Sequence, residues 1–171
     1  MRLFIALRPE KEMNDFIEHA QDSCRKLNVE GDYIPRDNFH LTLAFIGEYD
    51  DPDKVVEVIK EVPFRPWWIT IEHIGNFNDI WWAGFEKSGW LETLVHDIRQ
   101  ALEKAGIPYD KKEFIPHVTI IRNAKWKHGS HDLFIFPGEF HAGSSISLMR
   151  SDLDEDGNRV YTEVASVDAH Y

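Results

Sequence analysis

The stretch Asn38-Phe39-His40-Leu41-Thr42-Leu43-Ala44-Phe45 has the alternation of a buried β-strand with two polar side chains on one face. Side chains point alternately to the two faces of a strand, so His40 and Thr42 are predicted to share a face. The opposite face is predicted to carry Leu41, Leu43 and Phe45. Apolar side chains pack inward on other elements, which leaves the histidine and the threonine on an accessible surface.

A second copy of the pattern is Ile115-Pro116-His117-Val118-Thr119-Ile120, in which His117 and Thr119 again stand two positions apart. The composition of this chain gives roughly 0.3 His-x-Thr triplets by chance, and short motifs carry a false-positive risk. A single histidine on a strand is more often a hydrogen-bonded structural residue than a catalyst. Two copies, each followed by apolar residues, therefore favour a shared function.

Helix and strand signals surround the two motifs. Apolar residues at three- and four-residue steps predict helices, and alternating runs between turn residues predict strands. Asp50 or Asp51 is expected to cap the second helix, with Pro52 in its first turn. Besides the motif strands, the predicted elements are strands at 3–7, 67–74, 80–85, 140–149 and 159–167, a turn at 75–79, and helices that open at Pro9, at Pro52 and at Ser88 or Gly89.

The order of these elements predicts an α+β fold. Strand, helix and motif strand follow one another near the start of the chain and again, after a hairpin, in the middle. We therefore expect residues 1–171 to form one domain of two quasi-duplicated lobes. Antiparallel sheets would form a central cleft, with helices packed on the outer faces. Each lobe would offer one His-x-Thr strand to the cleft.

Composition restricts the partners of the chain. Its 30 acidic and 19 basic side chains give a formal net charge of −11, which disfavours an extended nucleic-acid surface because such surfaces need many Lys and Arg contacts to phosphates. A small anion or the end of an RNA would need a local positive site. No apolar run approaches the roughly 20 residues of a membrane span, and the lone Cys24 fits a reducing compartment. We expect a cytoplasmic monomer without a membrane partner.

Two histidines and two threonines on one cleft are suited to phosphodiester cleavage. A histidine titrates near pH 6.5, so one imidazole can act as a base while the other acts as an acid on the opposite side of a phosphate. Each threonine hydroxyl could donate a hydrogen bond to a non-bridging phosphate oxygen and stabilise growing charge. This chemistry requires no metal and no cofactor.

The two motifs resemble the paired signatures of the two-histidine phosphoesterase superfamily, and among its members the RNA 2′,3′-cyclic phosphodiesterases, also called LigT-type 2′-5′ RNA ligases. The resemblance spans nearly the full chain, and its two motifs are specific as a pair. The residues that carry it are Phe39 to Glu48, Phe114 to Arg122, the opening Arg2 to Leu7, Gly75-Asn76-Phe77 with Trp81 to Gly84, and Leu148 to Ser151 before Gly157 and Tyr161.

The resemblance implies hydrolysis of a 2′,3′-cyclic phosphate at an RNA end to a 2′-phosphate, with reversible 2′-5′ ligation as a side activity. It implies that His40 protonates the leaving 3′ oxygen, that His117 activates water, and that Thr42 and Thr119 hold the phosphate. Arg122 matches a family arginine that supports phosphate binding. It lies five residues after His117, so a regular strand would turn it away; either a bulge near Ile121 or a long reach around the strand edge would be needed.

Other residues have weaker signals. Tyr33, Arg36 and Phe39 precede the first motif and are candidates to contact a base or sugar, with packing or a solvated loop as the alternative for each. The set His128, His131 and His141 could suggest a metal site, but it lacks a cysteine and a recognisable ligand spacing, which favours a solvated loop.

Two other functions stay open at this stage. A relative of the same superfamily could open a different cyclic phosphate, such as ADP-ribose 1″,2″-cyclic phosphate, and a panel of substrates separates the two enzymes. A binding module for an RNA end or a nucleotide could keep the cleft without turnover. The presence of both histidines and both threonines disfavours that module.

Overall fold

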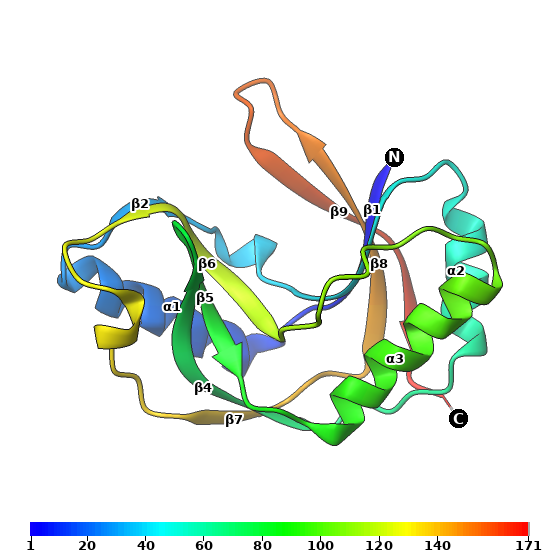
Figure 1. Cartoon of the computed structure of the whole chain (residues 1–171), viewed down its shortest axis with the longest axis horizontal. Helices are drawn as coiled ribbons and strands as arrows, with labels where there is room; N and C mark the ends of the chain where they lie inside the picture. Colours follow the sequence, from blue (N-terminus) through cyan, green and yellow to red (C-terminus); the bar gives the residue numbers. More distant parts are fainter. Residues whose placement is uncertain (171) are drawn as a thin grey trace.

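The computed structural model describes residues 1–170 and contains two antiparallel sheets in separate lobes (Figure 1). Sheet A has four strands in the spatial order β3 (Leu41–Glu48), β1 (Arg2–Leu7), β8 (Ser145–Leu153) and β9 (Arg159–Asp168). Sheet B has five strands in the order β2 (Glu30–Tyr33), β6 (His117–Lys125), β5 (Ile80–Phe85), β4 (Trp68–Phe77) and β7 (Gly138–His141). Each motif therefore belongs to a different sheet, and the α+β fold matches the prediction.

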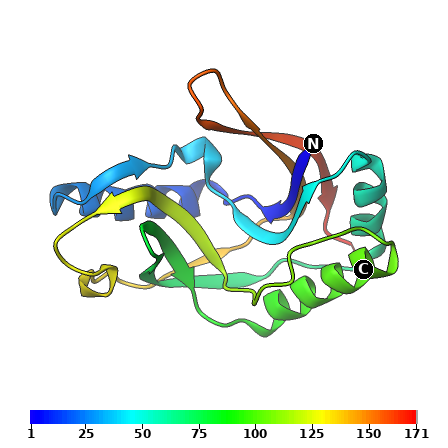
Figure 2. The same ribbon diagram turned by 45° about the horizontal axis from the view of Figure 1, so that its top comes forward.

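Two of the helices pack on a different sheet from the strand that precedes them in sequence. Helix α1 (Lys11–Lys26) follows β1 of sheet A in sequence but contacts β6 and β7 of sheet B. Helix α3 (Gly89–Lys104) lies between two strands of sheet B but packs with α2 (Pro52–Glu61) against sheet A. Figures 1 and 2 show α2 and α3 together on the lobe of sheet A and α1 on the lobe of sheet B. This exchange ties the two lobes together through their helices.

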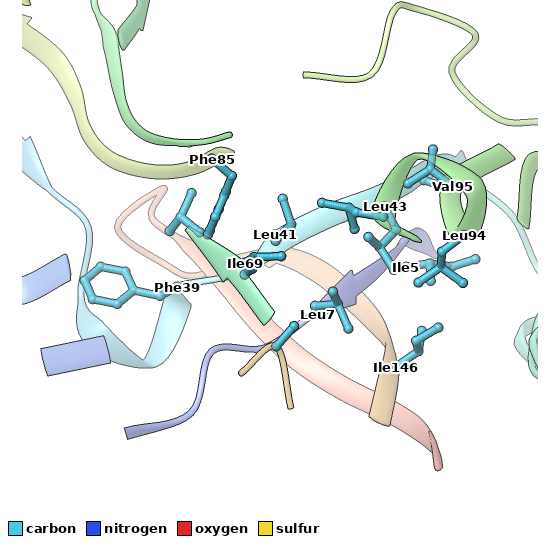
Figure 3. Packing of buried hydrophobic residues seen from close by; sticks show 14 of the residues in the cluster. Ile5, Leu7, Phe39, Leu41, Leu43, Ile69, Phe85, Leu94, Val95 and Ile146 are labelled. Atoms are coloured by element: carbon cyan, nitrogen blue, oxygen red, sulfur yellow. The ribbon is translucent and has the colours of Figure 1, made fainter. Parts of the chain in front are cut away.

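One continuous hydrophobic core extends through both lobes. Figure 3 shows the part under sheet A, where Leu41 and Leu43 of β3 lie with Ile5 of β1 near Leu94 and Val95 of α3. The side chain of Ile5 is fully buried, and burial of one such side chain is worth about 1.5–3 kcal/mol. The apolar face of the first motif strand thus holds it against a helix.

The three predicted helices are confirmed, although α1 begins at Lys11 and not at Pro9. Asp51 caps α2, because its side chain accepts a hydrogen bond from the backbone N–H of Lys54, and Pro52 is the first residue of the helix. In α3 the apolar residues from Leu91 to Leu102 recur at three- and four-residue steps, the spacing that predicts a helix, and they are buried. No helix among residues 1–170 is long and apolar enough to cross a membrane. Two short 3₁₀ helices cover Arg36–Asn38 and Ser130–Asp132.

The predicted turn at 75–79 is wrong in its first half. Strand β4 continues to Phe77, and only Asn78 and Asp79 turn the chain into β5, with Asn78 at a φ of 54°. Gly75 is a strand position opposite Trp82, and a Cβ at Gly75 would lie 2.3 Å from the indole ring. The glycine is needed there for the close approach of an aromatic ring and not for a turn.

The predicted strand at 140–149 is two strands in different sheets. Strand β7 pairs with β4 in sheet B, whereas β8 pairs with β1 and β9 in sheet A. Gly143, with a φ of 96°, lies at the crossing between them. Strands β8 and β9 form an antiparallel hairpin, which projects beyond the rest of sheet A in Figures 1 and 2.

Candidate active site

The two motifs meet in one pocket between the sheets. His40 directly precedes β3, His117 is the first residue of β6, and the two strands are in contact. The side chains of His40, Thr42, His117 and Thr119 all line a cavity of about 490 Å³. We call this cavity the central pocket.

A matching irregularity follows the threonine in both motif strands. The pairing of β1 with β3 leaves Leu43 as an extra residue, and the pairing of β5 with β6 leaves Ile120 as an extra residue. Each bulge places two successive apolar residues in the core and returns the next side chain to the cleft. The side chains that return are Phe45 and Arg122, and both line the central pocket.

The two bulges determine which way the side chains of Arg122 and Phe45 face. Arg122 lies on the pocket side together with His117, through the bulge that its odd spacing required. Phe45 was predicted on the core face with Leu41 and Leu43, and this is wrong. Its ring lines the pocket, with the guanidinium of Arg2 4.8 Å from the ring centroid. Strict two-residue alternation fails here because the extra residue reverses the facing of the side chains that follow it, up to the next irregularity of the strand at Ile46.

Both imidazoles are held in the same way. The Nδ1 atom of His40 lies 2.8 Å from the carbonyl oxygen of Asn38, and the Nδ1 atom of His117 lies 2.6 Å from that of Ile115. A carbonyl oxygen can only accept, so each Nδ1 donates its hydrogen. In the neutral ring the proton is therefore on Nδ1, which leaves a lone pair on Nε2. The backbone two residues upstream thus fixes the tautomer of each histidine.

The surroundings of the two rings differ. The ring centroid of His40 lies 4.8 Å from that of Phe4 and 5.0 Å from that of Tyr161, and burial lowers the pKa of His40 to about 4. The hydrogen bond to Asn38 opposes this shift, whereas the positive charges of His117, Arg122 and Arg8 add to it.

His117 has the ring centroids of Phe77 and Trp82 at 5.2 and 5.5 Å. Burial lowers the pKa of His117 as well, with a smaller contribution from Arg122, while the hydrogen bond to the Ile115 carbonyl raises it. Burial therefore favours the neutral form of both imidazoles when no anion is bound.

The central pocket is positively charged although the chain is acidic. Three arginines line it, Arg2, Arg122 and Arg159, and no Asp or Glu lines it among the described residues. None of the three forms an ion pair with a carboxylate within residues 1–170; Arg159 is 3.4 Å from the hydroxyl of Ser151. This is the local positive site that a small anion or an RNA end was expected to need.

Several pocket residues were not predicted as site residues, namely Arg2, Phe4, Arg159 and Tyr161. Arg2 and Phe4 alternate on β1, and Arg159 and Tyr161 alternate on β9, so each pair shares a face of its strand. This alternation is visible in the sequence, but it predicts pocket residues only once β1, β3, β8 and β9 are known to lie in one sheet.

The three upstream candidates do not line the central pocket. Phe39 is buried in the hydrophobic core. The hydroxyl of Tyr33 donates to the backbone carbonyl of Val29 at 2.6 Å. Arg36 forms ion pairs with two carboxylates of α1, those of Asp15 and Glu18. Their contacts are thus with the core, the backbone and α1, and a role for these residues in substrate contact stays a prediction.

The three histidines His128, His131 and His141 have separate contacts. His128 packs on Trp126, His131 is 3.5 Å from Asp132, and His141 packs edge-on against Trp68. Among residues 1–170 no group of three or more His, Cys, Asp or Glu side chains is arranged to hold a metal ion.

The chain is similar in sequence to proteins of one superfamily. The family model of the 2′-5′ RNA ligase superfamily matches residues 9–153. The RNA 2′,3′-cyclic phosphodiesterase of Archaeoglobus fulgidus is 31% identical over 132 residues, which cover 71% of this chain and 72% of the relative. The protein of the same description from Thermotoga maritima is 28% identical over 132 residues, which cover 71% and 70%.

Solved structures share the fold. The structure of TT0787 from Thermus thermophilus superposes with a TM-score of 0.80 at 26% identity and covers 98% of this chain and 97% of its own. E. coli LigT in its apo form gives a TM-score of 0.81 at 22% identity, with 99% and 98% covered. The complex of E. coli LigT with 3′-AMP gives 0.78 at 22% identity, with 98% and 97% covered. By its sequence match, this chain belongs to the 2′-5′ RNA ligase superfamily.

Proposed function

We propose that this protein hydrolyses the terminal 2′,3′-cyclic phosphate of an RNA to a 2′-phosphate without a metal ion, and that it also catalyses the related, reversible 2′-5′ ligation. The observation that carries the proposal is that two His-x-Thr motifs from different sheets line one pocket that contains three arginines. Relatives described as RNA 2′,3′-cyclic phosphodiesterases support this reaction class, and the LigT complex with 3′-AMP supports a nucleotide as ligand.

The phosphate is held by the groups that share a face with the histidines. Thr42 and Thr119 donate hydroxyl hydrogens to the two non-bridging oxygens, one from each sheet. Arg122 returns to the same face through its bulge and neutralises the charge that grows on these oxygens. The positive charge that a metal ion supplies in other phosphodiesterases comes here from side chains.

The chemical step uses the free Nε2 atom of each ring. His117 accepts a proton from water at Nε2 while the water oxygen forms a bond to phosphorus. The bond between phosphorus and the 3′ oxygen breaks, and the protonated Nε2 of His40 gives its proton to that oxygen. The phosphate stays on the 2′ oxygen. Throughout, Nδ1 of each ring keeps its hydrogen bond to the backbone carbonyl.

To act as the acid, His40 must take up a proton when the substrate binds. The low pKa of His40 in the free enzyme keeps the ring neutral at pH 7. A bound phosphate monoanion beside the ring favours the imidazolium, because an opposite charge within about 4–6 Å stabilises the charged form. The carbonyl of Asn38, which already raises the pKa of His40, then stabilises the imidazolium through Nδ1.

Hydrolysis of adenosine 2′,3′-cyclic phosphate tests the proposal directly. Chromatography against authentic 2′-AMP and 3′-AMP is expected to show 2′-AMP as the product, and EDTA is expected to leave the rate unchanged. A panel that includes ADP-ribose 1″,2″-cyclic phosphate checks the substrate class. Formation of 3′-AMP, complete loss of activity with EDTA, or binding without turnover would contradict the proposal.

A further inference from the structure

A second cavity opens from the central pocket on the side of His117. It has a volume of about 520 Å³ and shares Thr42, Phe45 and His117 with the central pocket, but His40 does not line it. Its apolar surface includes Phe77, Phe114 and Ile115. We call this cavity the His117 groove.

The apolar side chains of the groove are unusually open to solvent. Phe77 is 38% exposed and Ile115 is 39% exposed, although both are large and apolar. Phe77 also lies edge-on to the ring of His117, with the centroids 5.2 Å apart. Exposed aromatic and aliphatic surface that continues directly from a reactive centre marks a ligand-binding groove.

Charge distinguishes the groove from the central pocket. The central pocket has three arginines and no acidic lining residue among those described, which suits phosphate. The groove has a mixed rim with Arg99 and Lys112 beside Asp110 and Glu113. Two carboxylates disfavour a phosphate but can accept hydrogen bonds from the amino groups of a nucleobase. An aromatic floor with such a rim fits a base better than a phosphate.

The position of the groove indicates which nucleoside it holds. In a displacement at phosphorus the attacking and leaving oxygens lie roughly in line on opposite sides. This step rests on the proposed function, in which His40 attends the leaving 3′ oxygen and His117 the nucleophile. We propose that the His117 groove binds an acceptor nucleoside whose 5′-hydroxyl replaces water as the nucleophile, which makes it the acceptor site of 2′-5′ ligation.

The atoms of this transfer balance without a further reactant. The 5′ oxygen forms a bond to phosphorus, and its proton passes to Nε2 of His117. The bond from phosphorus to the 3′ oxygen breaks, and the proton of His40 passes to that oxygen. The product is a 2′-5′ phosphodiester with a free 3′-hydroxyl. The groove thus determines whether water or an RNA end attacks the same cyclic phosphate.

The test measures transfer and hydrolysis in the same tube. Adenosine 2′,3′-cyclic phosphate is the donor, and adenosine or glycerol is the added acceptor. The wild-type enzyme is expected to transfer to adenosine at least ~10-fold more effectively per mole than to glycerol, because only adenosine has a base to stack in the groove. Equal transfer to both acceptors overturns the inference while hydrolysis of the donor leaves the proposed function standing. Absence of all hydrolysis overturns both.

A variant of the groove sharpens the result. Phe114→Ala is expected to lower the preference for adenosine over glycerol by ~10-fold, the order of effect that stacking of one base on an aromatic ring has. Phe114→Trp should restore the preference. Phe136→Ala is the matched control, because Phe136 is an aromatic residue that is 78% exposed and lines neither cavity. If Phe114→Ala raises the KM of the donor and leaves the acceptor preference intact, the groove holds the donor base and the inference is wrong.

Inhibition of the wild-type enzyme tests the same inference without any substitution. 5′-Deoxyadenosine has the base but lacks the attacking hydroxyl. In the His117 groove it is expected to lower the ratio of transfer product to hydrolysis product when adenosine is the acceptor. An unchanged ratio, with both products reduced in parallel, means that it competes only at the donor site and contradicts the acceptor site.

Discussion

The two motif copies have the same backbone design but different surroundings. In each copy a carbonyl two residues upstream holds Nδ1 of the histidine, the threonine shares its face, and a bulge returns one more side chain to the pocket. The returned side chain is the apolar Phe45 in one copy and the cationic Arg122 in the other. Phe4 and Tyr161 pack on the His40 ring, whose pKa falls to about 4. The repeated backbone therefore supplies the geometry, while the packing around each copy sets its chemical role.

Removal of either histidine is expected to have the largest effect on activity. His40→Ala and His117→Ala should each lower kcat/KM for a 2′,3′-cyclic nucleotide by about 10²–10⁴-fold, because each variant loses one acid–base group. The double variant should be little worse than the worse single variant, since the two groups act in one step. Initial rates of 2′-AMP formation measure this. Full activity in either variant would contradict the claim that both motif copies act in one catalytic step.

The burial of His40 should make the stability of the protein depend on pH. The pKa of His40 is about 4 in the folded state against 6.5 when it is unperturbed, so the unfolded state binds more protons between these values. The free energy of unfolding should therefore fall as the pH drops from about 6.5 towards 4, by up to about 3 kcal/mol from this residue.

Urea denaturation at a series of pH values checks the effect. His40→Gln, which has no titrating ring, should flatten the dependence in that window. The matched change His117→Gln should flatten it less. An equal effect of the two substitutions would mean that the rings do not differ in burial.

The two bulge positions should differ in their importance for charge. Arg122→Ala is expected to lower kcat/KM by about 10–100-fold, the range of one or two charge-assisted hydrogen bonds to phosphate. Phe45→Ala removes no charge and should cost less than about tenfold, mainly through KM. Steady-state kinetics on both variants measure the difference. A larger loss of kcat/KM in Phe45→Ala than in Arg122→Ala would contradict the claim that only Arg122 stabilises the phosphate charge.

The pH at which kcat/KM is highest should lie below the ordinary pKa of histidine. The profile of kcat/KM reports the free enzyme, in which the pKa values of both histidines are lowered by burial, so its maximum is expected below pH 6.5. The profile of kcat should lie at higher pH, because bound phosphate raises the pKa of the acid. A maximum of kcat/KM above about pH 7 would contradict the burial of these groups.

The helices and the reactive pair could be predicted from the sequence because they depend on local pattern. The apolar stripe of α3, the cap at Asp51 and the two His-x-Thr triplets are each contained in a few neighbouring residues. Phe45 was misplaced, since a bulge is set by the partner strand and leaves no composition signal. Arg36 pairs with carboxylates 18 and 21 positions away, a contact that only the tertiary fold creates.

The roles of Arg2 and Arg159 could not be predicted for a related reason. They come from strands at opposite ends of the chain, and they face one pocket only because β8 lies between β1 and β9. Strand order in a sheet is a long-range property, so alternation along one strand identifies a shared face but not which pocket that face lines.

The measurement that tests the central claim most directly is a crystal structure of the protein with 2′-AMP. We predict that the 2′-phosphate lies between the two sheets, with Nε2 of His40 and Nε2 of His117 each within about 3.2 Å of a phosphate oxygen. Arg122 should contact the same group. A phosphate that touches only one of the two rings, or that lies outside the central pocket, would contradict the joint action of the two motifs.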